Sequence, residues 1–378
     1  MTRVLIYIDD LSIKGGGERV AMYFLKVLLR NNIDTYFLTL TNVSTFEEIN
    51  TYYRRNPKKF FKGNIFSYLL YSIPKKSRIM SIALDYIFLI STYLQLFFIN
   101  YRVKPHVYIV IANTTCQNVP FILHGKHIIS WGLTPFTKKW PLILHNILLK
   151  LSLRREKLIL IVGSEYQKEK SDKEYRSYVR VIPVGYDDTL FKYCGEKKIE
   201  KKIAYVARIS PEKRIDLAIE AAKLLKEKDE GFKLVIVGCL QNKKYYEKIR
   251  YKIMKYGLSS HVELITEESP TMIRKNLLEA EVFWNFSEGY GGIVNYEALA
   301  CGCIPVVLKN FGDMIGDYGY TVNDIREAVD ATLKILRMER EKKREMALKC
   351  SRYAMNFSES IFEKKFMNLF TCIIQGKD

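Results

Sequence analysis

Two glutamates flank a run of glycine and apolar residues in the segment EGYGGIVNYEALACG, which spans residues 288–302. Glu288 opens this segment, and Glu297 lies nine positions later, where small residues favour a helix. A buried carboxylate is costly unless a protein group or a ligand donates hydrogen bonds to it. Because carboxylates accept hydrogen bonds from the hydroxyls of sugars and riboses, these acids are candidates for a sugar-binding site.

A second chemical signal is the basic turn in the segment VARISPEKRIDLAI, residues 206–219. Arg208 ends a predicted strand, Lys213 follows five positions later, and a helix is predicted from Ile215. Two fixed cations beside the N-terminus of a helix suit a diphosphate, because they supply charge neutralisation and N–H donors. Taken alone, the pattern is equally typical of an exposed basic turn.

Glycines follow the first predicted strand in the stretch KGGGERV, residues 14–20. Gly16 and Gly17 would let the backbone approach a ligand closely, and the next helix would present free N–H groups to an anion. A tight turn needs the same residues, so the stretch alone identifies no ligand. It lacks the GxGxxG spacing, and Asp34 begins the next strand instead of ending it, which argues against a nicotinamide dinucleotide.

The elements that must position these residues alternate between strands and helices along the chain. The predicted strands are residues 3–8, 34–40, 107–113, 126–131, 157–164 and 179–185 in the first half, and 202–208, 232–238, 261–266, 280–286 and 303–309 in the second. Such alternation predicts parallel βαβ units. We therefore expect an α/β protein of two Rossmann-like domains, with ligands bound at the carboxyl ends of the strands.

Length and composition are consistent with two globular domains, because 378 residues are too many for one ordinary core. The seven cysteines include no CxxC pair, and the five histidines show no ligand spacing. Neither a zinc site nor a disulfide framework is expected, which favours a reducing, cytoplasmic location. The first residues, MTRVLIYIDD, become acidic too early for a signal peptide.

The formal net charge of +19 favours polyanionic partners, namely nucleic acid, an anionic membrane face or phosphorylated small molecules. A Lys-rich solvated surface would explain it as well. Aromatic residues and cations alternate in residues 52–62, and the apolar segment 79–101 is long enough to resemble a membrane span. Asp85 and Gln95 interrupt that segment, so we expect a helix that faces the core or lies on a membrane surface.

These motifs together resemble the retaining glycosyltransferases of family 4, whose GT-B fold has two Rossmann-like domains and an interdomain cleft. The matching stretches are GGGERV, RVIPVGYDDTLF, VARISPEKRID, SEGYGGIVNYEALACGCIPVV and YAMNFSESIFEKKF, so the resemblance spans nearly the whole chain. It implies an N-terminal acceptor-binding domain over residues 1–185 and a nucleotide-sugar-binding domain over 186–355. Residues 356–378 would form a C-terminal helix that packs back on the first domain.

The resemblance implies a metal-independent, cofactor-free transfer of a sugar from a nucleotide-diphosphate sugar to an acceptor hydroxyl. In that role Arg208 and Lys213 hold the diphosphate, Glu297 holds the ribose hydroxyls, and Glu288 contacts the transferred sugar. The implied catalytic residues are Arg208, Lys213 and Glu288. The implied donor-binding residues are Gly16, Gly17, Arg208, Lys213, Gly291, Gly292, Ile293 and Glu297.

The sequence departs from the family pattern in three places. Eight residues separate Glu288 from Glu297, whereas the family usually has seven between its two glutamates. When the segment is aligned on Glu297, the position of the family's first glutamate therefore falls on Gly289. A one-residue bulge at 291–292 would return Glu288 to that place. Arg214 replaces the usual glycine after the lysine, and Trp131 and Gly132 stand where the family commonly has a donor-contacting histidine.

Several interpretations of the function remain open at this point. The acceptor could be a lipid-linked glycan or another glycoconjugate, and a lipid acceptor would agree with an anionic membrane surface as partner. Another sugar-nucleotide or sugar-phosphate enzyme of the same fold, such as an epimerase or a phosphorylase, is the first alternative. A basic nucleic-acid-binding protein is the second, although it leaves both glutamates beside the basic turn unexplained.

Overall fold

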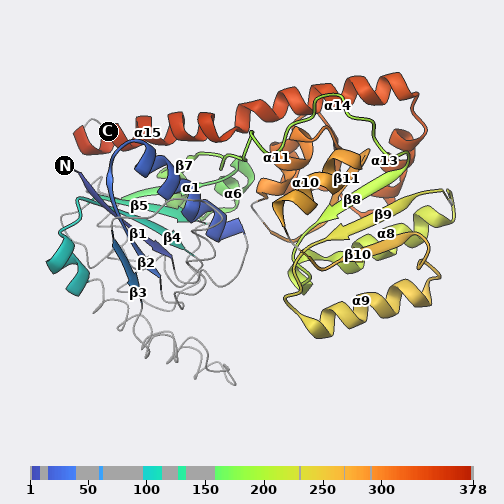
Figure 1. Cartoon of the computed structure of the whole chain (residues 1–378), viewed down its shortest axis with the longest axis horizontal. Helices are drawn as coiled ribbons and strands as arrows, with labels where there is room; N and C mark the ends of the chain where they lie inside the picture. The colour runs from blue at the N-terminus through green and yellow to red at the C-terminus, as the bar shows by residue number, and fades with distance from the viewer. Residues whose placement is uncertain are drawn as a thin grey trace. The chain divides into compact units, whose positions relative to one another are not determined.

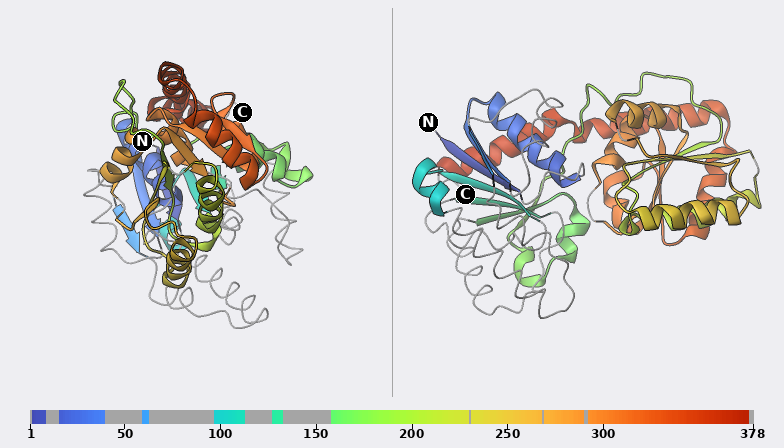
Figure 2. Two further views of the ribbon diagram at one scale, coloured as in Figure 1. Left: turned by 90° about the vertical axis from the view of Figure 1, so that its right-hand side faces the viewer. Right: turned by 60° about the horizontal axis from the view of Figure 1, so that its bottom comes forward.

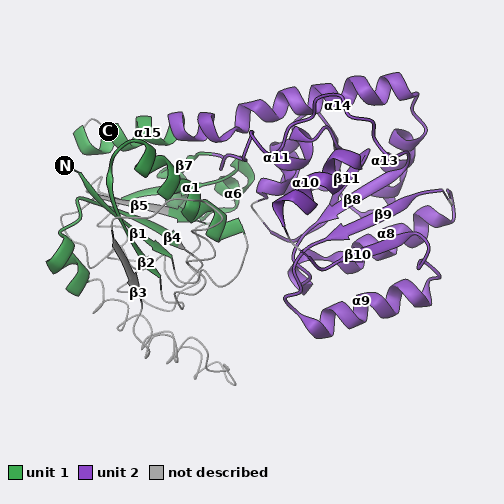
Figure 3. Cartoon of the chain, viewed as in Figure 1, with its two compact units in different colours: residues 1–182, 365–378 green, residues 183–364 purple. Residues whose placement is uncertain are grey.

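The computed structural model of the protein describes residues 2–8, 16–39, 59–62, 97–112, 127–132, 158–229, 231–267, 269–289 and 292–375. The chain forms two compact units, each with its own sheet (Figures 1 and 3). Unit 1 comprises Met1–Ile182 and Lys365–Asp378, and unit 2 comprises Pro183–Lys364. The chain therefore passes between the units twice, after Ile182 and after Lys364, whereas the sequence analysis placed the boundaries after residues 185 and 355.

The described part of unit 1 forms a parallel sheet of seven strands in the order β3-β2-β1-β4-β5-β6-β7. These strands are β1 Arg3–Ile8, β2 Asp34–Thr39, β3 Lys59–Lys62, β4 Val107–Ala112, β5 His127–Gly132, β6 Leu158–Val162 and β7 Val179–Val181. The order runs outward in both directions from β1 and β4, as in a doubly wound fold. The predicted Rossmann-like architecture is confirmed for this unit.

Strand β3 was missed by the sequence analysis, which treated residues 52–62 as an interleaved aromatic and basic stretch. In the structure Lys59–Lys62 pairs in parallel with β2, and Lys59 lies opposite Tyr36. As the outermost strand of the described sheet, β3 has a neighbour on one side alone. Lysines are common on such edges because charge discourages pairing with another chain.

Helix α1, Gly16–Arg30, packs on the unit 1 sheet with one apolar face, and residues of helices α6 Glu165–Lys170 and α7 Lys173–Arg176 are also buried. The Phe24 ring of α1 makes edge-on contacts with Trp131 at 5.3 Å and with Phe366 at 4.7 Å between ring centroids. Trp131 is buried within β5. Trp131, which stands where the family commonly has a donor-contacting histidine, therefore belongs to the hydrophobic core of unit 1.

The described part of unit 2 forms a parallel sheet of six strands in the order β10-β9-β8-β11-β12-β13. These strands are β8 Lys202–Val206, β9 Lys233–Val237, β10 Val262–Ile265, β11 Val282–Asn285, β12 Ile304–Leu308 and β13 Tyr320–Val322. Helices lie on both faces of this sheet, which gives three layers (Figure 2). The prediction of a second doubly wound domain is thereby confirmed.

The helices of unit 2 bury apolar side chains, and a buried tryptophan bonds a strand of the sheet to one of them. The α-helices are α8 Ile215–Lys226, α9 Lys243–Lys255, α10 Pro270–Glu279, α11 Ile293–Ala300, α12 Gly312–Ile315, α13 Ile325–Leu336, α14 Arg340–Ala354 and α15 Glu359–Gln375, the last of which continues into unit 1. Trp284 is buried in β11 and donates its indole N–H to Thr332 Oγ1 at 2.9 Å. A buried indole N–H needs such an acceptor.

The two chain segments near the unit boundaries pair with each other. Tyr186 forms a β-bridge with Ser358, because its N–H donates to Phe357 O at 3.1 Å and its carbonyl accepts from the Glu359 N–H at 3.0 Å. Gly185 makes the approach possible, since a Cβ there would lie 2.8 Å from Glu359 Cα and 2.9 Å from Ser358 O.

The apolar segment 79–101 lies largely outside the described residues, and its last part, 97–101, is helical. Among the helices that the structure describes, none combines the length and the apolar character that a membrane crossing requires.

We expect Gly185→Ala to destabilise the protein, because its methyl group would overlap backbone atoms that cannot rotate away. Overpacking of this kind costs about 1–3 kcal/mol. Gly16→Ala is the matched control, since a Cβ there meets no atom within 4 Å. Thermal unfolding followed by circular dichroism should show a lower Tm for Gly185→Ala alone. Equal Tm values for the two variants would contradict the close approach.

Candidate functional site

The cations Arg208 and Lys213 lie on the loop that follows strand β8. Pro211 begins the short 3-10 helix η2, Pro211–Lys213, where its fixed φ suits the first position. The Lys213 N–H donates to Ser210 O, and the Arg214 N–H donates to Pro211 O, each at 3.0 Å. The turn therefore holds both cations at the carboxyl end of β8, the side of an α/β sheet where ligands bind.

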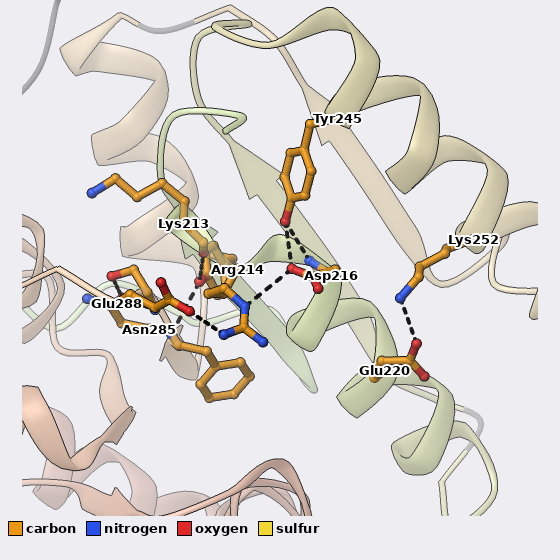
Figure 4. A network of polar contacts seen from close by, with 11 residues as sticks. Lys213, Arg214, Asp216, Glu220, Tyr245, Lys252, Asn285 and Glu288 are labelled. Carbon is orange, nitrogen blue, oxygen red and sulfur yellow. Dashed lines mark hydrogen bonds and ion pairs between the residues drawn. The ribbon is translucent and has the colours of Figure 1, made fainter. Parts of the chain in front are cut away.

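The electrostatics of this loop favour an anion. Burial lowers the pKa of the Lys213 ammonium, and the nearby Arg208 guanidinium lowers it further, while Glu212 acts in the opposite direction. Arg208 Nη2 lies 3.7 Å from Glu212 Oε1. In Figure 4 the Lys213 side chain extends away from the surrounding polar network. A ligand phosphate at the ammonium would relieve both the desolvation and the repulsion from Arg208.

The loop after strand β11 is held by side-chain amides. Asn285 accepts from the Ser287 N–H at 3.2 Å and from Ser287 Oγ at 2.7 Å, and donates to Asn295 Oδ1 at 2.9 Å. Asn310 Nδ2 donates to the carbonyls of Ser287 at 3.2 Å and Gly289 at 2.6 Å. Because Asn285, Ser287 and Asn295 are all buried, these bonds fix the loop firmly.

A buried tyrosine ties this loop to the cation loop. Tyr205 Oη donates to the carbonyl of Lys213 at 2.6 Å and accepts from the Phe286 N–H at 3.2 Å. A second tie is made by the backbone, as the Glu288 N–H donates to Glu212 O at 3.0 Å. Burial is the main cause that raises the pKa of Tyr205, so its hydroxyl stays protonated and can donate.

The two glutamates that flank the glycine segment have opposite surroundings. The side chain of Glu288 is 62% exposed and forms an ion pair with the guanidinium of Arg214 (Figure 4). Glu297 lies on helix α11, is 0% exposed and interacts with other groups of the protein. Burial of carboxylates was predicted for both, and the structure shows it for Glu297 alone.

The glycines of the predicted donor site begin helices. Gly292 is the N-cap of α11 and Ile293 its first residue, while Gly16 and Gly17 begin α1 in unit 1. A Cβ at Gly292 would lie 2.7 Å from Asn295 Nδ2, so glycine lets this buried amide pack against the turn. Gly291, where part of the expected bulge falls, lies outside the described residues.

Sequence reasoning missed the residues that hold the two loops together. Tyr205 and Asn285 were each interpreted as part of a strand. Their places near the carboxyl ends of those strands, close to the chemistry-bearing loops, were the available signal. In the part of the chain that the structure describes, no three His, Cys, Asp or Glu side chains gather in a way that could hold a metal ion.

Comparison with known proteins shows what the chain is similar to. Residues 187–356, nearly the whole of unit 2, match the family model described as glycosyl transferases group 1. Anabaena HepE, solved with UDP and glucose, has 12% sequence identity and a TM-score of 0.71, and the alignment covers 98% of this chain and 100% of that chain. The fold is GT-B.

Two further solved structures have a similar fold. Sucrose-phosphate synthase from Thermosynechococcus elongatus has 13% identity and a TM-score of 0.76, with 100% of both chains covered. A mutant of S. aureus TarM, solved with fondaparinux, alpha-GlcNAc-glycerol and UDP, has 15% identity and a TM-score of 0.72, with 98% of this chain and 100% of that chain covered. The search of curated proteins found no match.

We expect Tyr205→Phe to lower the free energy of unfolding by about 1–3 kcal/mol, because the Phe286 N–H loses its acceptor and the Lys213 carbonyl loses its donor. Tyr251→Phe is the control, since Tyr251 is 59% exposed on α9 and exposed sites typically change by less than about 0.5 kcal/mol. Urea unfolding of both variants measures the difference. If the two variants have the same free energy of unfolding, the hydrogen bonds of Tyr205 do not stabilise the protein as proposed.

Proposed function

We propose that the protein is a retaining, metal-independent glycosyltransferase that moves a sugar from a nucleotide-diphosphate sugar to an acceptor hydroxyl. The observation that carries this proposal is the pair of cations after β8, where Lys213 has a lowered pKa beside Arg208. Such a pair suits the two phosphates of a sugar nucleotide. The GT-B fold and the glycosyl transferases group 1 match over unit 2 support it.

In this proposal the residues of unit 2 act mainly by positioning and by electrostatics. Arg208 and Lys213 bind the diphosphate and stabilise the negative charge that grows on it as the sugar bond breaks. The leaving phosphate accepts the proton of the acceptor hydroxyl, which attacks from the same face. No side chain then has to serve as a general base.

The remaining donor contacts are proposed from the resemblance. Glu297 holds the ribose hydroxyls, and the backbone of Gly292 and Ile293 at the start of α11 faces the phosphates. Gly291, which lies outside the described residues, is proposed for the same role. Gly16 and Gly17 of unit 1 contact the phosphates or the sugar. UDP is the first nucleotide to test, because HepE and TarM were both solved with it.

We further propose that the acceptor lies in an anionic membrane. The helical residues 97–103 expose Phe97 to 61%, Phe98 to 64% and Tyr101 to 77%, and Arg102 and Lys104 beside them are also exposed. Aromatic rings prefer the membrane interface, and each cation near an anionic surface contributes about 1 kcal/mol. The formal charge of +19 supports the same partner.

Removal of the Lys213 charge should weaken UDP binding about 10- to 100-fold, because a charge-assisted hydrogen bond contributes roughly 1.5–3 kcal/mol. Isothermal titration of wild type, Lys213→Ala and the control Lys244→Ala, an exposed lysine of α9, measures the loss. If all three proteins bind UDP and other nucleoside diphosphates equally, or none does, the proposed function fails. Nucleotide release from UDP-sugars with and without an acceptor then separates a transferase from an epimerase.

UDP affinity should also fall at alkaline pH. A bound phosphate favours the charged ammonium, so UDP binds with its highest affinity while Lys213 is protonated. The affinity declines as the pH rises through the pKa that Lys213 has in the free protein. Because that pKa is lowered, the decline begins below the 10.5 of an ordinary lysine. Lys213→Arg should bind without this dependence, since arginine stays charged. A decline that persists in Lys213→Arg would assign the titration to another group.

The membrane proposal predicts salt-sensitive flotation with vesicles of phosphatidylglycerol and phosphatidylcholine. Phe97→Ser combined with Phe98→Ser should reduce binding at least about tenfold, because each buried aromatic ring contributes roughly 1.5–3 kcal/mol. The control is Tyr251→Ser combined with Met254→Ser, two side chains of unit 2 that are 59% and 61% exposed. Absence of wild-type binding at low salt would refute the proposal.

A further inference from the structure

Arg214 adopts a backbone conformation that an arginine does not favour. Its φ of 47° and ψ of 39° are left-handed, and it joins η2 to helix α8. The side chain of any L-residue is strained there, whereas glycine is not. The conformation explains why a glycine at this place would suit the turn, and it raises the question of what the arginine side chain contributes.

The guanidinium of Arg214 is held between two carboxylates. Nη1 donates to Glu288 Oε1, and Nε lies 3.7 Å from Asp216 Oδ1 (Figure 4). Asp216 is itself fixed by α9, because Tyr245 Oη donates to Asp216 Oδ1 at 2.8 Å and accepts from the Asp216 N–H at 3.0 Å. A chain of polar contacts thus runs from α9 through α8 to the loop after β11.

Stability alone does not account for this arrangement. The side chains of Arg214 and Glu288 are 33% and 62% exposed, and ion pairs of such exposure contribute little to folding. The free-energy cost of a left-handed backbone at a non-glycine residue is at least as large as the stabilisation that such an ion pair provides. The benefit must therefore be geometric.

We propose that Arg214 and Glu288 form a clamp that positions the loop after β11 against the diphosphate loop, and that Glu288 acts through Arg214 instead of gripping the donor sugar. Both are positioning residues. The clamp adds a side-chain tie to the two ties described above, the Tyr205 hydroxyl and the backbone bond from Glu288 to Glu212. The inference about the sugar rests on the proposed function, whereas the clamp itself does not.

The clamp also determines which cations are available to bind the diphosphate of the donor. The charge of Arg214 is balanced by Glu288 and Asp216. Arg208 and Lys213 are then the cations of this loop that face the diphosphate. The extra arginine consequently changes the rigidity of the site and not the number of cations that bind phosphate.

Hydrogen exchange of the ligand-free protein tests the clamp. Arg214→Gln and Glu288→Gln should each speed amide exchange in peptides covering residues 286–289 about two- to fivefold, the range expected for an exposed ion pair. The double variant should exchange no faster than either single variant. Arg214→Glu combined with Glu288→Arg should restore much of the protection. The control is Lys252→Gln with Glu220→Gln, an ion pair of 2.8 Å between α9 and α8.

Arg214→Gly separates positioning from stability. We expect its Tm to equal or exceed that of the wild type, because glycine relieves the left-handed strain, while exchange at residues 286–289 still rises. Additive effects in the double variant, or exchange equal to that of the Lys252 and Glu220 control, would overturn the clamp.

Kinetics with the best-binding UDP-sugar test the role of Glu288. Glu288→Gln and Arg214→Gln should lower kcat by similar factors and without additivity. A loss in Glu288→Gln far larger than in Arg214→Gln would assign the acid to the sugar and overturn the inference. If the wild type binds no nucleoside diphosphate, the proposed function fails, and the exchange measurements still decide the clamp.

Discussion

The hydroxyl of Tyr205 is the contact on which the candidate site depends. It lies in the core at the end of β8, where it satisfies a carbonyl of the cation loop and an N–H at the end of β11. In such a low-dielectric setting each bond is strong, and an unpaired group would be costly. The cations and the loop that leads to α11 therefore share one rigid reference point, and the exposed contacts around them only refine their positions.

The fold was largely predictable because its long strands are continuous apolar runs. Predicted strands 202–208 and 232–238 became β8 Lys202–Val206 and β9 Lys233–Val237, both almost wholly buried. The strands that escaped prediction are short and lie at sheet edges, such as β13 Tyr320–Val322. Three residues are too few to show a period, so only pairing with a neighbour reveals them.

The positions of the candidate residues were largely predictable, but their partners were not. Lys213 lies in the predicted turn and Glu297 in the predicted helix, whereas Arg208, predicted to end a strand, lies in the loop beyond β8 Lys202–Val206. It could not show that Glu288 pairs with Arg214, because residues 74 positions apart meet only through tertiary packing. The left-handed turn at Arg214 was equally invisible, since that conformation is rare for arginine and leaves no mark in the pattern of residue types.

The contact between Phe24 and Phe366 joins the beginning of the chain to its end within unit 1. Every residue of unit 2 leaves the ribosome before Phe366 does, so the intervening unit can complete its own core first. The part of α1 that contacts α15 stays exposed to the solvent or to a chaperone until that helix has been synthesised. Unit 1 therefore completes its core only after unit 2 has been synthesised.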